Sequence, residues 1–292
     1  MQPKPSWLKT SIPHGDVYFN IRKNLRAHGL VTVCEEAKCP NIGECWNTGT
    51  ATFMVLGDTC TRACRFCHVK TGKPPAVDAL EPQRVADSVR IMNLDYAVIT
   101  MVDRDDLDDG GVAHLVAVVK AVRAAKPQIK VELLTSDFAG NIEALKHLLT
   151  EAPPDVFAHN IETIARLSPR VRDARASYQR SLQLLQMAKR LRPTLFTKSA
   201  LMLGLGEERE EVKAALQDLR AHAVDLLTIG QYMRPTPKHL RVKSYAPPQE
   251  FAELQACAKE LGFLGVAAGA LVRSSYRARD FYLAASKHKQ SC

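Results

Sequence analysis

The sequence predicts an α/β fold, a partial (β/α)6 TIM-like barrel, and three observations carry this prediction. From residue 51 onward, short apolar runs that suit buried strands alternate with longer segments of helical periodicity, and such repeats imply a parallel sheet. The chain has 292 residues, of which 46% are hydrophobic, and one such barrel can use the whole length. Polar motifs follow the apolar runs, at the strand ends where the working residues of such a barrel lie.

Six strand–helix units can be placed along the chain. Strands are expected at 51–56, 96–102, 130–134, 156–161, 195–203 and 226–230. The helices that follow them are expected at 81–92, 112–125, 142–149, 178–191, 208–219 and 249–261, with a further apolar piece at 263–267 and an early helix at 18–28. We expect three parts: an N-terminal extension (1–50), the barrel core (51–262) and a short C-terminal extension (263–292).

Composition narrows the compartment and the partners. The first residues lack the continuous apolar segment of a signal peptide, and the weakly polar run 261–272 is too short to span a bilayer. Eight cysteines without an export signal indicate a reducing, cytoplasmic setting in which thiolates bind metal rather than form disulfides. The net charge of +9 indicates either a surface that attracts nucleic acid, membrane or an acidic protein, or simply a solvated basic surface. No nucleic-acid-binding module or membrane segment is apparent, so neither partner is expected.

One set of cysteines directly follows the first expected strand. Cys60, Cys64 and Cys67 have the spacing C-x3-C-x2-C. Three thiolates suit a soft metal centre, but they are one short of the four that complete a structural zinc site or a fully ligated iron–sulfur cluster. On a four-iron cluster they would leave one iron open. The pattern resembles the signature of radical S-adenosylmethionine (SAM) enzymes, in which SAM occupies that iron.

A second set lies just upstream, with Cys34, Cys39 and Cys45 in the spacing C-x4-C-x5-C. The spacing fits zinc pairs poorly, since these usually run C-x2-4-C, and it also differs from the plant-type ferredoxin pattern. The two sets together resemble those of lipoyl synthases, and the resemblance extends over nearly the whole chain. It implies a radical SAM barrel with an auxiliary [4Fe-4S] cluster on the upstream set.

The strand ends carry further motifs of this family. Asp103 and Arg104 belong to a segment that resembles the DRDD motif, and the resemblance places them at the active-site mouth. Asp108 and Asp109, which precede the next helix, are expected to cap it. Asn160 and Glu162 are two apart, so on an extended segment they point the same way and suit a ribose diol. They also match the HNxET motif that contacts SAM; a polar strand end facing water is the alternative.

Three later segments complete the resemblance. Lys198 interrupts an apolar strand, where a lysine requires an anion, and the family motif there assigns it to the cofactor site. Gln231 and Arg234 match the GQYxxPT segment and are expected to meet substrate or the SAM carboxylate. Ser275 lies in an RSSY motif, which in lipoyl synthases supplies the fourth ligand of the auxiliary cluster. Ser274 is the alternative ligand.

The resemblance implies the following chemistry. SAM, bound to the cluster on the downstream cysteines, yields a radical that removes hydrogen from an octanoyl chain amide-linked to a carrier lysine. The auxiliary cluster then supplies sulfur at C6 and C8. The implied partners are octanoylated carrier domains (the glycine-cleavage H protein or a 2-oxoacid dehydrogenase E2 subunit), an electron donor such as ferredoxin or flavodoxin, and an iron–sulfur carrier for cluster repair.

Three other functions share some of these features. Biotin synthase, another sulfur-inserting radical SAM enzyme, shares the downstream cysteine motif, but the upstream set argues against it. A two-cluster electron-transfer protein would use both cysteine sets, yet it has no need for a long barrel with SAM-type motifs. A zinc-stabilised binding module is the third alternative.

Overall fold

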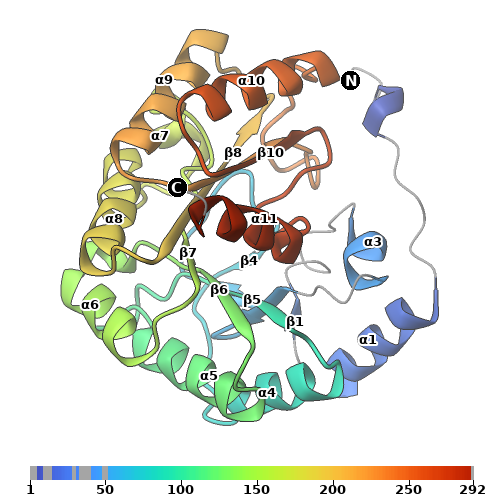
Figure 1. Ribbon diagram of the computed structural model, residues 1–292, viewed down its shortest axis with the longest axis vertical. Helices are drawn as coiled ribbons and strands as arrows, with labels where there is room; N and C mark the ends of the chain where they lie inside the picture. The colour runs from blue at the N-terminus through green and yellow to red at the C-terminus, as the bar shows by residue number, and fades with distance from the viewer. Residues whose placement is uncertain (1–4, 9–14, 28–30, 33–40, 48–51, 291–292) are drawn as a thin grey trace.

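The computed structural model describes residues 5–8, 15–27, 31–32, 41–47 and 52–290, and the structural statements below concern these residues. Cys34 and Cys39, two of the expected auxiliary-cluster ligands, lie outside them. Helices form an outer ring around a curved sheet, and one helix, α11, crosses the middle of the ring in the view of Figure 1. No helix in the described ranges is long and apolar enough to cross a membrane.

The described chain forms one eight-stranded sheet in the order β1-β2-β5-β6-β7-β8-β9-β10. The strand bounds are Val31–Thr32 (β1), Thr52–Val55 (β2), Tyr96–Met101 (β5), Lys130–Leu134 (β6), Val156–Ala158 (β7), Phe196–Leu203 (β8), Leu226–Gln231 (β9) and Gly265–Gly269 (β10). β1 pairs antiparallel with β2, whereas the strands from β2 to β10 are parallel. A separate parallel ladder joins β3 (Thr59–Cys60) to β4 (Lys70–Thr71). Because β1 and β10 remain edges, the sheet is an open, partial barrel, as predicted.

Helices connect the strands and cover the outer face of the sheet. Their bounds are Asp16–Ala27 (α1), Ile42–Asn47 (α3), Glu81–Ile91 (α4), Val112–Ala125 (α5), Ile142–Glu151 (α6), Ser168–Val171 (α7), Tyr178–Leu191 (α8), Arg209–Ala221 (α9), Pro248–Glu260 (α10) and Ala278–Gln290 (α11). Single 3-10 turns occur at Ser6–Leu8 and Phe138–Gly140. Most expected strands and helices begin and end within about one or two residues of these bounds, the usual uncertainty of such limits.

Local sequence explains where the helices begin. In α8, the Ser177 side chain accepts a hydrogen bond from the Arg180 amide, and the leucines at helical spacing that follow are buried. In α5, the Asp109 carboxylate accepts hydrogen bonds from the amides of Gly111 and Ala113. The capping role expected of Asp109 is therefore confirmed.

Two strands differ from their expected spans. The strand expected at 156–161 ends at Ala158, because the chain then leaves the ladder and Glu162 makes only an isolated bridge to Leu201. The apolar piece expected at 263–267 forms β10, which extends the parallel sheet beside β9. β10 consists of glycine and alanine with one valine, so its hydrophobic signal was too weak to predict a strand.

Helix α11 closes the floor of the barrel. Its inner side chains are Ala278, Phe281, Tyr282 and Ala285. They pack against the first residues of four parallel strands, namely Tyr96, Val156, Phe196 and Leu226. The amino-terminal end of the barrel is therefore filled by side chains, and the carboxyl ends of the strands are left for a binding site.

A buried ion pair lies inside the barrel next to this floor. Lys198 Nζ lies 2.7 Å from a carboxylate oxygen of Glu132, and the two side chains are only 1% and 2% exposed. The other Glu132 oxygen accepts a 2.7 Å hydrogen bond from the Tyr96 hydroxyl. The ammonium also lies 5.6 Å from the ring centroid of Phe281 in α11. Lys198 thus has a protein anion as its partner.

Removing one member of this pair should destabilise the fold more than removing both. We expect Glu132→Gln to lower the free energy of unfolding by about 3–5 kcal/mol, because it leaves a buried ammonium without its counter-charge. The double variant Glu132→Leu/Lys198→Met should lie closer to the wild type. Urea unfolding followed by circular dichroism measures both. A loss below about 1 kcal/mol in Glu132→Gln would contradict a dry, charged pair.

Candidate active site at the carboxyl ends of the strands

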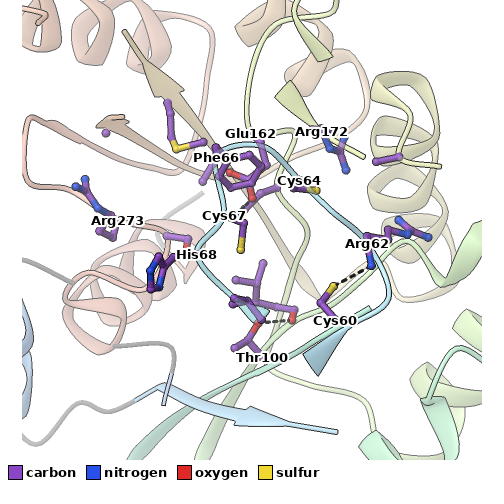
Figure 2. A pocket seen from close by; sticks show the side chains of 18 of the residues that line it. Cys60, Arg62, Cys64, Phe66, Cys67, His68, Thr100, Glu162, Arg172 and Arg273 are labelled. Carbon is purple, nitrogen blue, oxygen red and sulfur yellow. Dashed lines mark hydrogen bonds between the residues drawn. The ribbon is translucent and has the colours of Figure 1, made fainter. Parts of the chain in front are cut away.

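A cavity of about 520 Å³ opens at the carboxyl ends of the parallel strands, at the opposite end of the barrel from α11. The loop after β3, the ends of β5, β6, β8 and β9, and the segments 159–162 and 272–274 line it. Figure 2 shows this cavity from close by. Its size suits a cofactor-sized ligand. The polar motifs that follow the strands do meet at one place, as expected of such a barrel.

Cys60, Cys64 and Cys67 all line this cavity on a single loop (Figure 2). The loop is held by backbone hydrogen bonds to three other parts of the barrel. The Thr61 amide donates to Asp103 O at 3.0 Å and the Arg65 amide to Val171 O at 2.9 Å. The Leu240 amide donates to Arg65 O at 3.2 Å. The cysteines are therefore presented by a loop that is anchored on both sides.

The surroundings of the three thiols fit ligands of a cationic metal centre. Burial raises the pKa of Cys60 and Cys64 to about 12 and that of Cys67 to about 11, with a further contribution from Asp103. Thiolates would therefore need a nearby positive charge such as iron. Backbone amides already point at the sulfurs: Arg62 and Asp103 donate to Cys60 Sγ at 3.4 and 3.3 Å. Such N–H···S hydrogen bonds tune iron–sulfur clusters.

The arrangement is not that of a single-ion site. Among the described residues, no three His, Cys, Asp or Glu side chains converge to hold one metal ion. A cluster of several irons is larger than one ion, so its cysteines need not converge on one point. A donor set of three soft sulfurs on one loop fits a [4Fe-4S] cluster with one open iron.

A buried arginine within the cysteine motif ties this loop to two strand ends. The Arg62 guanidinium contacts the carboxylates of Asp103, Asp105 and Asp137 at 3.2, 2.7 and 2.6 Å, and its side chain is 3% exposed. Asp103 also lies 3.7 Å from Cys60 Sγ. Burial, together with the neighbouring carboxylates, raises the pKa of Asp103 to about 6 although Arg62 opposes this shift. Asp103 thus lies in the cavity wall beside the first cysteine.

Asn160 and Glu162 are brought together in the cavity. The Asn160 amide donates a 3.0 Å hydrogen bond to Glu162 Oε1. Glu162 adopts a left-handed backbone conformation (φ +65°), an unusual one for a residue with a side chain, and such strain is concentrated at functional sites. Burial raises the pKa of its carboxyl group. An amide and a carboxyl group therefore face the cavity side by side.

Lys198 and Arg104 do not join the cavity, which corrects the placement expected for both. Lys198 is occupied by Glu132 near the barrel floor. The Arg104 guanidinium turns toward the carbonyl groups of Leu56 and Pro75, at 3.3 and 3.2 Å, and its charge is paired with the neighbouring acid Asp106. In each case a carboxylate of the protein pairs with the cation, Glu132 with Lys198 and Asp106 with Arg104. Neither cation therefore faces the cofactor site or the mouth.

Gln231 and Arg234 line the cavity, but backbone groups occupy their polar atoms. The Gln231 amide donates to the carbonyl oxygens of Leu203 and Ser244 and accepts from the Ala246 amide. The Arg234 guanidinium donates to the carbonyl groups of its own loop, including His239 O at 2.9 Å. Both side chains therefore form part of the cavity wall, with their polar groups bonded to the protein backbone. The sequence motif alone could not indicate these backbone partners.

Arg172 is a cavity residue that the sequence reasoning missed. Its side chain is buried, lines the cavity and lies near Cys64 in Figure 2. One guanidinium nitrogen donates to Ser181 Oγ at 2.9 Å, and no carboxylate of the described chain pairs with it. Burial and the nearby Arg172 charge lower the pKa of His159 to about 4, so His159 is neutral there. A buried, unpaired arginine beside the cluster loop is suited to bind an anion.

The C-terminal loop meets the helix that carries Cys45. The Thr52 hydroxyl donates to Ser275 Oγ at 3.0 Å, and the Tyr276 hydroxyl donates to Glu44 in α3 at 2.9 Å. Cys45 follows Glu44 in this helix and is buried. Ser274, the neighbour of Ser275, lines the cavity. The RSSY motif therefore lines the cavity through Ser274 and contacts, through Tyr276, the helix that carries Cys45, the only upstream cysteine that the described residues include.

Comparison with known proteins agrees with this geometry. The model of the radical SAM superfamily matches residues 54–219, and that of the N-terminal domain of lipoyl synthase matches residues 2–39. The lipoyl synthase of Deinococcus radiodurans is 54% identical over 283 residues, which cover 97% of this chain and 85% of the relative. The mitochondrial lipoyl synthase of Drosophila melanogaster is 52% identical over 285 residues, covering 96% and 75%.

Solved structures agree at the level of the fold. The FeFe-hydrogenase maturase HydG from Carboxydothermus hydrogenoformans has a TM-score of 0.60 at 14% identity, covering 92% of this chain and 60% of that one. Methylornithine synthase has a TM-score of 0.57 at 13% identity, covering 83% and 67%. The expected radical SAM barrel is confirmed, and membership of this superfamily implies SAM and a [4Fe-4S] cluster as cofactors. Together, the family models and the relatives show that the chain belongs to the lipoyl synthase family of sulfur-inserting radical SAM enzymes.

Proposed function

We propose that the protein is a lipoyl synthase that inserts sulfur at C6 and C8 of an octanoyl chain on a carrier lysine. The observation that carries the proposal is the shared cavity of the three loop cysteines, the Asn160–Glu162 pair and the unpaired Arg172. An electron-transfer protein needs no nucleotide-sized cavity beside its cluster. Removing hydrogen from an alkane carbon is beyond any side-chain acid or base, so the cofactors must supply the reactivity.

The loop cysteines would hold the SAM-cleaving cluster. Cys60, Cys64 and Cys67 are its three ligands, and their amide neighbours offset part of the thiolate charge. When bound, the reduced cluster and SAM supply a 5′-deoxyadenosyl radical for hydrogen removal. The protein's own contribution is to hold this loop still through Arg62 and to keep water from the buried sulfurs.

The polar groups of the cavity would orient SAM. Asn160 and Glu162 offer an amide and a carboxyl group for the ribose hydroxyls. Arg172 offers a guanidinium that has no carboxylate within ion-pair distance among the described residues, which suits the SAM carboxylate. Asp103 lies beside Cys60 and can accept hydrogen bonds from the SAM ammonium. These residues would thus hold SAM by its ribose and by its amino-acid end.

The sulfur donor would be an auxiliary [4Fe-4S] cluster on Cys34, Cys39, Cys45 and Ser275. The contacts of the C-terminal loop with α3 support this ligand set, because they bring Ser275 to the segment that carries Cys45. A serine oxygen is a hard, poor ligand for soft cluster iron. Such a bond is easily broken, which suits a cluster that is consumed as a substrate.

The proposed reaction defines the partners. The substrate is an octanoylated carrier domain, either the glycine-cleavage H protein or an E2 subunit of a 2-oxoacid dehydrogenase. Each SAM cleavage consumes one electron, which a ferredoxin or flavodoxin would deliver. Because the auxiliary cluster loses sulfur, an iron–sulfur carrier must rebuild it before the next turnover.

Single cysteine variants should separate the two clusters. In anaerobically reconstituted protein with SAM, dithionite and an octanoyl-lysyl peptide, we expect Cys64→Ala to form no 5′-deoxyadenosine and no product. Cys45→Ala should still form 5′-deoxyadenosine but insert no sulfur. Mass spectrometry of the peptide and chromatography of the nucleoside measure both outcomes.

Cys257→Ala is the matched control, since this thiol lies in α10, does not line the cavity and belongs to neither cysteine motif, so its loss should leave turnover unchanged. The proposal fails if Cys45→Ala still yields the two-sulfur product. It also fails if the wild type with both clusters loaded does not cleave SAM.

The role of Arg172 can be tested by equilibrium binding alone. We expect Arg172→Gln to weaken binding of S-adenosylhomocysteine to the oxidised, cluster-loaded protein by roughly 10- to 100-fold, because a charge-assisted hydrogen bond is lost. Binding of 5′-methylthioadenosine, which has the nucleoside but no carboxylate, should change little. Isothermal titration calorimetry measures both. An equal loss for the two ligands would show that Arg172 only supports the cavity.

A further inference from the structure

Two segments beside the cavity mouth are rich in cations and contain no acid. Residues 65–73 carry Arg65, Lys70 and Lys73, and residues 234–243 carry Arg234, Lys238, Arg241 and Lys243. Neither segment has an Asp or Glu, although the chain as a whole contains 31 of them against 40 Lys and Arg. Together the two segments hold seven cations and no acid.

The fold places these two stretches against each other at the mouth. Leu240 N donates to Arg65 O at 3.2 Å, and His239 Nε2 lies 2.9 Å from Cys67 O. The rings of His68 and His239 lie 5.7 Å apart. Both segments also contribute residues to the cavity wall. Their exposed cations therefore belong to segments that also line the cavity, and we call Arg65, Lys70, Lys73, Lys238 and Arg241 the basic rim.

The charges of the basic rim are exposed and largely uncompensated. Each of its five residues is exposed to solvent. Of these, only Lys70 has a carboxylate within ion-pair distance in the described structure, Asp58 at 3.9 Å, and both of those side chains are about half exposed or more. Elsewhere on the surface, basic side chains more often have close acidic neighbours, as in Arg166 with Glu211 at 2.6 Å. The rim thus concentrates positive potential at the entrance to the cavity.

We propose that the basic rim docks the acidic face of the protein domain that bears the acylated lysine. The inference rests on the proposed function and adds the surface through which the substrate is recognised. The reacting carbons sit at the end of a lysine arm, so the arm must enter the cavity while its domain rests on the surrounding surface. Only a negatively charged face complements that surface.

Charge complementarity of this kind acts mainly on the rate of encounter and is weakened by salt. The rim cations lie outside the cofactor and cysteine contacts described above, so changing them should leave the chemistry intact. A free octanoyl-lysyl peptide has no domain to dock, so its kcat/KM should not depend on the charges of the basic rim. The carrier and the peptide therefore form a matched pair of substrates that isolates docking from catalysis.

The test reverses two rim charges and compares them with two charges at the opposite end of the barrel. The rim variant is Lys238→Glu/Arg241→Glu. The control is Arg190→Glu/Arg192→Glu, because these residues are also exposed but lie at the end of α8, before β8 begins at the barrel floor. For each protein, kcat/KM is measured with the octanoylated H protein and with the octanoyl-lysyl peptide, at low and high salt. Binding of the H protein is measured separately by biolayer interferometry.

We expect the rim variant to lose tenfold or more in kcat/KM for the carrier, in line with the size of electrostatic steering. Its activity on the peptide should stay within about twofold of the wild type, and the salt dependence of carrier turnover should shrink. Wild-type kinetics with the carrier, or an equal loss in the control variant, would overturn the inference. A DNA duplex is tested on the same interferometer. A rim variant that loses binding to the duplex but binds the H protein like the wild type would also overturn the inference.

The proposed function and the docking surface fail separately. If the wild type does not modify even the peptide, the proposed function fails. The binding measurement then still decides whether the rim holds the acidic carrier. If all variants modify the peptide but the rim variant binds the H protein as tightly as the wild type, the proposed function stands and the docking surface is wrong.

Discussion

The guanidinium of Arg62 joins the cysteine loop to the ends of β5 and β6 through three carboxylates, those of Asp103, Asp105 and Asp137. Three acids this close together would repel one another without the shared cation. A planar, forked donor can serve several carboxylates at once, which a lysine cannot do in the same way. The positions of Cys60 and its neighbours therefore depend on an arginine that contacts neither cluster nor substrate in the proposed mechanism.

The two ends of the barrel are built for different purposes. At the floor, α11 fills the space inside the strands, and the Lys198–Glu132 pair is sealed from water. At the mouth, polar groups line an open cavity, and one cation, Arg172, lacks a carboxylate partner within the described residues. A buried cation with a counter-charge, such as Lys198, thus supports the fold. A buried cation without one among the described residues, such as Arg172, is available to bind a ligand.

Much of this architecture could be predicted from sequence because its signals are local. Helical and strand periodicity located nearly every element. Asn160 and Glu162 do meet, but through the left-handed backbone of Glu162 and not through the extended segment that the spacing of two assumed. The failures depend on long-range pairing. Lys198 was assigned to the cofactor because its partner Glu132 lies on another strand, and Arg172 was missed because its isolation appears only in three dimensions. The glycine- and alanine-rich strand β10 carried too little hydrophobic signal to predict.

The ratio of SAM cleaved to sulfur inserted tests the central claim most directly. The wild-type protein, loaded with both clusters, would be given an octanoyl-lysyl peptide in a single turnover, and 5′-deoxyadenosine and peptide mass would be measured together. Insertion at two carbons predicts two molecules of 5′-deoxyadenosine and two sulfur atoms for each peptide converted. SAM cleavage with an unchanged peptide, or no cleavage at all, would contradict the assignment of this cavity to lipoyl synthesis.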